Sequence, residues 1–144
     1  MKSYLKTTAG VVLSATMATA SYGATVNVGE LQGFTGPLES MIGAMSGGAN
    51  LAVTEANASG KYLQGTINVI QGDSVCIDAA VAIAQAEKMV NDDNVMAIMG
   101  PNCSGNTGAV ITNVLVPNGI VSISPSATSP ALTTLEDGGW FFRT

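Results

Sequence analysis

Five short apolar segments, separated by stretches with a helical pattern, restrict the fold of this sequence more than any other feature. Segments such as VMAIM and IVSI are nearly all apolar or rich in β-branched residues, which is typical of strands buried on both faces of a parallel sheet. Strands are predicted at residues 25–31, 65–70, 95–99, 120–123 and 140–143, and helices at 39–58, 79–91 and 109–116. Because strands that alternate with helices at this spacing form βαβ units, we predict an α/β protein with a doubly wound parallel sheet.

The predicted helices carry end signals and apolar stripes. Asp78 is a suitable N-cap for the second helix, and Gly60 supplies a stop for the first. The second and third helices have stripes formed by Ala82, Ala86, Met89 and Val90 and by Val110, Ile111, Val114 and Leu115. In the first helix, apolar residues lie near one face, namely Met41, Ala44, Met45, Leu51, Ala52 and Ala56.

Residues 1–23 have the layout of a secretory signal peptide. Lys2 and Lys6 precede a short apolar stretch at 9–18, and small residues at 18–23 offer two cleavage sites. A membrane-spanning helix would need about 20 apolar residues, so the alternative is an N-terminal amphipathic helix of a cytosolic protein. With no cysteine near the cleavage region, we expect export to the periplasm without a lipid anchor, with residues 24–144 forming the folded part.

The charge and composition exclude several functional classes. The chain has 10 acidic and 5 basic residues, without a basic cluster, which argues against nucleic acid and anionic membrane surfaces as partners. The sequence has no histidine, so Ser-His-Asp and Cys-His pairs and imidazole zinc sites are excluded. We therefore predict that the protein is not an enzyme and has neither a metal nor a cofactor.

Two cysteines in an exported chain are expected to form one disulfide. A bond between Cys76 and Cys103 would stabilise the fold by roughly 3 to 4 kcal/mol if the gain comes from the restricted unfolded chain. The alternative is two unrelated buried thiols.

Candidate binding residues lie in three loops that follow predicted strands, at residues 33–37, 100–107 and 124–130. In an open α/β sheet such loops share one edge, where ligands bind. Hydroxyl side chains beside unpaired backbone N–H groups receive a carboxylate or phosphate without a formal positive charge. Ser104, Thr107 and Thr128 are the candidates, and ordinary capping and turn chemistry is their alternative role.

Other motifs in and near these loops do not indicate a nucleotide site or an acid–base pair. Residues 100–107, G-P-N-C-S-G-N-T, match the phosphate-binding pattern G-x-x-x-x-G-K-[ST] except that Asn106 replaces the lysine. Among the acidic residues, Asp92 and Asp93 are expected in a solvated turn away from the loops, whereas Asp73 lies near the strand ends and could orient a loop.

Several motifs together resemble periplasmic substrate-binding proteins of the branched-chain amino acid type, which serve ABC importers. The matching pieces are G-F-T-G-P at 33–37, L-A-V-T-E-A-N-A-S-G at 51–60, G-D-S-V-C at 72–76, G-P-N-C-S-G-N-T at 100–107, S-P-S-A-T-S-P-A-L-T at 124–133 and the terminal F-F-R-T. They follow the family in order and spacing over essentially all of residues 26–144.

The resemblance implies a type I periplasmic binding fold, with two lobes that close on the ligand, and a disulfide between Cys76 and Cys103. It also implies that Ser104 holds the α-carboxylate of an amino acid and that Ser126, Ala127 and Thr128 contact the carboxylate and the ammonium. A residue within 38–42 is implied to line the side-chain pocket. The chain departs from the family where Gly105 and Asn106 replace further hydroxyl residues.

The resemblance also implies partners. Family members are well over twice as long, so we expect this sequence to be the truncated N-terminal lobe of a protein that is monomeric at full length. Its expected role is to capture an amino acid or small carboxylate for a permease in the inner membrane. The alternative is a ligand-binding sensory domain with the same fold.

Overall fold

The computed structural model describes residues 23–61 and 65–144. The predicted signal peptide lies almost entirely outside these residues, at 1–22. The elements in chain order are β1 (Thr25–Gln32), α1 (Glu39–Ser59), β2 (Thr66–Asp73), α2 (Ala79–Asn91), β3 (Val95–Met99), α3 (Ser104–Val110), the π-helical turn η1 (Ile111–Leu115), α4 (Val116–Asn118), β4 (Val121–Ser124), the 3₁₀ turn η2 (Pro130–Thr133) and β5 (Phe141–Arg143).

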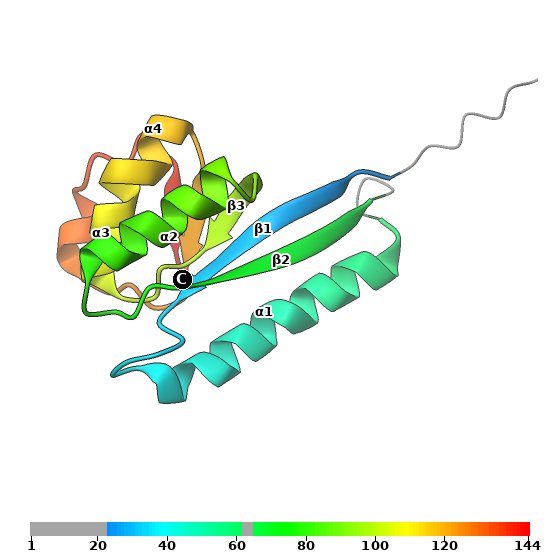
Figure 1. The fold of residues 1–144 in the computed structure, drawn as a ribbon, viewed down its shortest axis with the longest axis horizontal. Coiled ribbons are helices and arrows are strands. Elements are labelled where there is room, and N and C mark those ends of the chain that lie inside the picture. The colour runs from blue at the N-terminus through cyan, green and yellow to red at the C-terminus, as the bar shows by residue number, and fades with distance from the viewer. Residues whose placement is uncertain (1–22, 62–64) are drawn as a thin grey trace, which may run out of the picture.

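The five strands form one parallel sheet in the order β2-β1-β3-β4-β5 (Figure 1). The predicted doubly wound α/β fold is therefore confirmed. The chain runs outward from β1 to β2 and then crosses back to β3 on the other side of β1, so the strand order reverses between β1 and β3. In open sheets of this kind, ligands bind outside the carboxyl ends of the strands at that reversal.

Two predicted element boundaries were wrong by at least three residues, and the others lie within two residues of the observed ones. The third helix begins at Ser104 rather than at residue 109, because Thr107 N–H already donates to the Cys103 carbonyl at 2.8 Å and closes a first turn. Strand β2 continues through Asp73, because its last residues still pair with β1, up to Asp73 opposite Gln32.

The core lies between the sheet and the helices α2 and α3–η1. It contains Leu31, Ala82, Ala86, Met89, Val95, Ile98, Val110, Ile111, Val114 and Leu115, together with residues of β5 and the loops around η2. The two predicted apolar stripes are thereby confirmed, with Val90 only half-buried. Asp78 caps α2 as expected, since its carboxylate accepts the Ala80 N–H at 2.8 Å.

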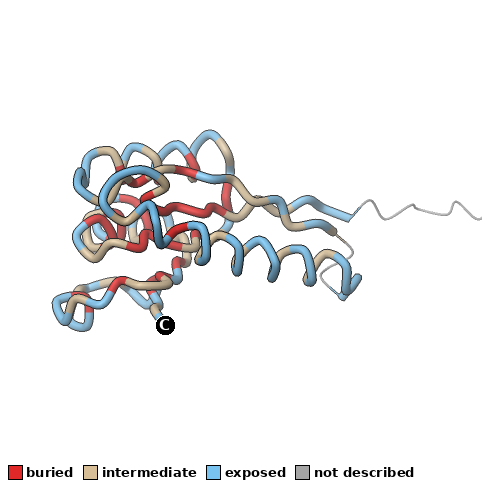
Figure 2. The backbone as a smooth tube through the Cα atoms, turned by 90° about the horizontal axis from the view of Figure 1, so that it is seen from below, coloured by how far each residue is buried: buried red, intermediate tan, exposed pale blue. Residues whose placement is uncertain are grey.

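Helix α1 lies on the other face of the sheet and covers only its β2 edge. The amide of Gln71 on β2 donates to the Ser46 hydroxyl of α1 at 3.4 Å. Ile42 is the buried residue of this helix, whereas Met41 and Leu51 are 52% and 59% exposed, and Figure 2 shows most of the helix as exposed. The apolar face predicted for α1 therefore does not enter the core.

The rest of this face of the sheet is apolar and uncovered among the described residues. It holds a hollow of about 300 Å³ lined by side chains of β1, β3, β4 and β5. We call the following six residues the open sheet face: Val28, Ala97, Met99, Val121, Ile123 and Phe142. In the described part of the chain, no helix is both long and apolar enough to cross a membrane.

Candidate functional site

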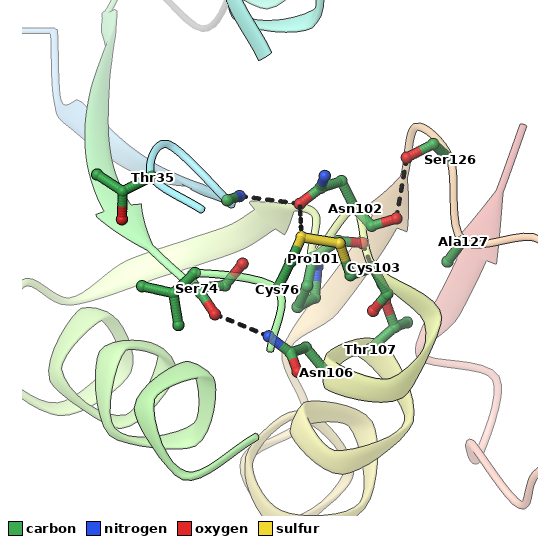
Figure 3. The surroundings of a disulfide bond; sticks show 12 residues. Thr35, Ser74, Cys76, Pro101, Asn102, Cys103, Asn106, Thr107, Ser126 and Ala127 are labelled. Carbon is green, nitrogen blue, oxygen red and sulfur yellow. Dashed lines mark hydrogen bonds between the residues drawn. A yellow bond between two sulfur atoms is a disulfide. The ribbon is translucent and has the colours of Figure 1, made fainter. Parts of the chain in front are cut away.

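The carboxyl ends of β1, β2, β3 and β4 meet at one edge of the sheet, which we call the rim. It consists of residues 33–37, 74–77, 100–103 and 125–129, with the first turn of α3 beside them (Figure 3). Ser104, Thr107, Ser126, Ala127 and Thr128 all lie in the rim or in that turn, whereas the segment 38–42, expected to supply a pocket residue, lies at the start of α1. The structure thus brings together loops that are far apart in the sequence.

The loop after β3 lies at the centre of the rim and holds its neighbours. The side-chain oxygen of Asn102 accepts the Gly33 N–H at 2.9 Å, and its carbonyl accepts the Ser126 hydroxyl at 2.9 Å (Figure 3). The next carbonyl back, that of Pro101, accepts the Ser124 hydroxyl at 2.6 Å. Side chains therefore join the loops after β1 and β4 to the loop after β3.

The predicted disulfide between Cys76 and Cys103 is present, with the two Cα atoms 5.5 Å apart. It connects the loop after β2 to the start of α3 (Figure 3). A second connection lies beside it, where the buried Asn106 amide donates to the Ser74 carbonyl at 2.7 Å. Asn106 is a position at which this chain departs from the resembled family by lacking a hydroxyl residue. In the structure its side-chain amide connects α3 to the loop after β2.

Asp73 orients the first loop, as the sequence suggested. Its carboxylate accepts the Thr35 hydroxyl at 2.5 Å, the Thr35 N–H at 3.3 Å and the Val75 N–H at 2.9 Å. Partial burial acts to raise the pKa of Asp73, but these hydrogen bonds, with one from the Phe34 N–H, outweigh it and hold the pKa below its ordinary value.

Ser104 and Thr128 are the predicted residues placed at the surface of the rim. Ser104 is half-buried at the start of α3, and its hydroxyl oxygen accepts the Ser129 N–H at 3.1 Å. Thr128 is exposed in the loop after β4. Since Ser129 follows Thr128 directly, the bond between Ser129 and Ser104 brings the two hydroxyl residues into one neighbourhood.

The other three predicted residues donate hydrogen bonds within the protein, and Ser126 is half-buried like Ser104. Ser126 donates its hydroxyl proton to Asn102, and Ala127 is buried with its N–H donated to the Ser124 hydroxyl at 3.0 Å. Thr107 is fully buried, and its hydroxyl bonds to the carbonyls of Pro101 at 2.9 Å and Cys103 at 3.0 Å. The buried positions of Ala127 and Thr107 suit residues that hold the shape of the rim.

Sequence reasoning missed Asn102 and Arg143. The Arg143 guanidinium, on β5, donates to the carbonyls of Ala127 at 3.0 Å and Ser129 at 2.8 Å and to the Thr133 hydroxyl at 2.7 Å. A usable signal existed, because Arg143 is the one basic residue of the sequence beyond Lys88. Within residues 23–61 and 65–144, no group of three acidic or cysteine side chains is placed to hold a metal ion.

Comparisons with known proteins agree on one family. Residues 25–144 match the family model described as periplasmic binding protein. The Leu/Ile/Val-binding protein of Escherichia coli strain K12 is 34% identical over 104 residues, covering 65% of this chain and 28% of the relative. The amino acid binding protein of Pseudomonas aeruginosa is 31% identical over 94 residues, covering 65% of this chain and 25% of the relative.

Solved structures show the same fold. The branched-chain amino acid transporter substrate-binding protein LivJ of Streptococcus pneumoniae, solved with isoleucine, has a TM-score of 0.75 and 33% identity and covers 83% of this chain and 33% of its own. A solute-binding protein from R. palustris, solved with benzoate, has a TM-score of 0.73 and covers 83% of this chain and 32% of its own. At 22% identity, this similarity supports a shared fold and nothing further. The chain thus spans about a third or less of the length of these proteins.

Proposed function

Because this chain belongs to the periplasmic binding protein family, we propose that it is the ligand-binding N-terminal lobe of a solute-binding protein for an ABC importer. The proposed ligand is an amino acid, branched-chain or similarly small, or a small carboxylate. The observation that carries the proposal is the hydrogen bond from the Ser129 N–H to the Ser104 hydroxyl at 3.1 Å, which joins Ser104 to the loop that carries the exposed Thr128.

The hydrogen bond that Ser104 accepts leaves the proton of the Ser104 hydroxyl free to be donated elsewhere. A serine hydroxyl has one proton to donate, and its oxygen here already accepts the Ser129 N–H. The proton is therefore available to a ligand oxygen. A ligand carboxylate is a suitable acceptor, because hydrogen bonds to an ionised group are about twice as strong as neutral ones.

Ser126 has the opposite polarity and fits the other end of an amino acid. Its proton goes to the Asn102 carbonyl at 2.9 Å, so its oxygen is left to accept a hydrogen bond. An ammonium group donates up to three such bonds and accepts none. We place the ligand carboxylate between Ser104 and Thr128 and the ammonium near Ser126. Ala127 and Thr107, which are buried, support these residues.

The partners and boundaries form part of the same proposal. Residues 1–23 act as an export signal to the periplasm, residues 24–144 form one lobe, and a second lobe closes over the ligand and completes its contacts. The relatives named above are amino acid binding proteins, and LivJ is named as part of a transporter. A membrane permease is therefore the proposed recipient of the ligand, and the binding protein acts as a monomer without catalysing a reaction.

The test is amino acid binding by the full-length protein that carries this sequence. Leucine, isoleucine, valine and a panel of other amino acids and small carboxylates are screened for a rise in melting temperature. The dissociation constant of the best ligand is then measured by calorimetry. Ser104→Ala and Thr128→Ala should each weaken binding about ten- to hundredfold, since each removes a hydrogen bond to a charged group.

Thr112→Ala is the matched control for these variants. Thr112 lies in the same continuous helical stretch as Ser104, but its exposed hydroxyl donates to the Gly108 carbonyl at 3.0 Å. Its removal should leave the dissociation constant unchanged. The proposal fails if no compound in the panel stabilises the protein, or if both rim variants bind as tightly as the parent.

A further inference from the structure

We propose that Arg143 is a positioning residue, which holds the loop after β4 so that the Thr128 N–H points toward the ligand. This inference rests on the proposed function for its ligand, but its structural basis does not. Arg143 lies on β5 at the far edge of the sheet, whereas the ligand residues lie on the loop after β4 and the first turn of α3.

The Arg143 guanidinium donates hydrogen bonds to the carbonyls of Ala127 and Ser129, two alternate residues of the loop after β4. The Nη1 atom donates to the Ala127 carbonyl at 3.0 Å and to the Ser129 carbonyl at 2.8 Å, and Nη2 donates to the Thr133 hydroxyl at 2.7 Å. The planar guanidinium has fixed donor directions. Both carbonyls must therefore face the same side, toward β5.

The direction of the Thr128 N–H follows from that of the Ala127 carbonyl. The two groups belong to one peptide unit, and in a trans peptide the C=O and the N–H point in opposite directions. With the carbonyl turned toward Arg143, the N–H is turned away from it. This N–H donates to no described residue.

The neighbouring peptide groups have partners within the protein. The Ala127 N–H donates to Ser124 at 3.0 Å, and the Ser129 N–H donates to Ser104 at 3.1 Å. The Ser129 carbonyl precedes Pro130, which has no N–H. Thr128 is thus the loop position that offers both a backbone N–H and an exposed hydroxyl.

The charge of Arg143 adds to this geometry. A cation that binds a peptide carbonyl polarises the peptide unit and strengthens the hydrogen bond that the same unit donates on its other side. The guanidinium therefore acts on an anionic ligand through one peptide unit, without touching it. This explains how a rim built from hydroxyl and amide groups can favour a carboxylate.

The test compares three variants of the full-length protein with leucine, isoleucine and valine as probes. Arg143→Met removes the positive charge and the hydrogen bonds to the loop. Arg143→Lys keeps the charge but lacks the planar guanidinium and its fixed donor directions. Lys88→Met removes one positive charge from an ion pair with Asp93 at 2.6 Å, at the opposite end of the strands. We expect dissociation constants about ten- to hundredfold higher for Arg143→Met, intermediate values for Arg143→Lys and values within about twofold of the parent for Lys88→Met.

A second measurement needs no ligand. In Arg143→Met, amide hydrogen exchange of Ser129 should become faster, because the loop no longer keeps its N–H on Ser104, while exchange in β1 and β3 should stay unchanged. Arg143→Lys should show a smaller effect of the same kind, and it decides the result if Arg143→Met does not fold.

Distinct outcomes would contradict the inference and the proposed function. Equal weakening by Arg143→Met and Lys88→Met would mean that only the overall charge matters. Parent-like exchange at Ser129 in a folded Arg143 variant would mean that the loop holds its shape alone, and either result overturns the role of Arg143. If the parent protein binds no amino acid, the proposed function fails, and the exchange measurement still decides the role of Arg143.

Discussion

At the scale of single residues, the hydroxyl side chains around the rim differ in where their protons go. Thr107, Ser122 and Ser124 are buried and donate to carbonyls of the segment at 100–103. Such bonds satisfy carbonyls that have no partner in a helix or strand. Ser104 and Thr128 lie nearer the surface, and we propose that only these two donate to a ligand.

Asp73 makes the stability of the chain depend on pH. Hydrogen bonds lower its pKa in the folded state below the ordinary value, so the ionised carboxylate stabilises the fold at higher pH, and this contribution is lost as the pH falls through the folded-state pKa. Asp73→Asn should therefore lower the free energy of unfolding at neutral pH, and its difference from the parent should shrink below about pH 3.8.

Urea unfolding of the chain at a series of pH values measures that difference. Asp92→Asn is the matched control, because Asp92 is exposed at the opposite end of the strands and the substitution changes the charge equally. A difference between Asp73→Asn and the parent that stays constant down to pH 3 would contradict the assigned role of the Asp73 carboxylate.

The sequence could identify the rim residues but could not divide them by role. Ser104 and Thr107 are both hydroxyl residues in one helical turn, and nothing in their local sequence shows which is buried. Their difference arises because Thr107 faces the carbonyl of Pro101, whose position depends on the packing of β3 against β1 and β4. The role of Arg143 depends in the same way on the pairing of β5 with β4.

At the scale of elements, the close approach of the end of β3 to β1 requires a glycine. Gly100 has a φ of +115°, and a Cβ at this position would collide with the Leu31 carbonyl oxygen. Gly100→Ala should therefore destabilise the chain by about 1–3 kcal/mol from backbone strain alone, with the collision adding to that loss.

Gly105→Ala is the matched control for Gly100→Ala. Gly105 lies within α3, and a Cβ there meets no heavy atom within 4 Å. This substitution should raise the free energy of unfolding by up to about 1 kcal/mol, because alanine is the better helix former. Equal effects of the two substitutions in thermal unfolding would show that the strand contact at Gly100 is not constrained.

Element types were predictable from the sequence, and the errors have a tertiary origin. The periodicity of α2 and of 110–115 is local and was interpreted correctly. The early start at Ser104 was hidden because glycine and asparagine at 105–106 have low helix propensity, while the disulfide at Cys103 and the bond between Asn106 and Ser74 hold that turn in place. The extension of β2 to Asp73 depends on its pairing with β1.

At the scale of the whole molecule, one face of the sheet is packed and the other is half covered. Helices α2 and α3–η1 cover the first face, whereas the open sheet face leaves Ile123 47% and Phe142 54% exposed. Contiguous apolar surface of this kind promotes association and binds apolar dyes. We expect the 144-residue chain to bind such a dye and to self-associate as its concentration rises.

Replacing Ile123 and Phe142 together by threonine should reduce both effects. Ile77→Thr is the matched control, because Ile77 is 76% exposed but lies in the loop before α2, away from this face. Dye fluorescence and sedimentation velocity give the two readouts. Dye binding as strong in the double variant as in the parent would contradict the assignment of dye binding and self-association to the open sheet face.

The connections across the rim have a kinetic consequence for ligand capture. The loops at 33–37, 100–103 and 125–129 are held by a disulfide and by hydrogen bonds before any ligand arrives. A ligand that lands on a surface already ordered loses little free energy to arranging it. Association rate constants at this lobe should then be fast and similar among amino acids, so that residence time, and not arrival, distinguishes one amino acid from another.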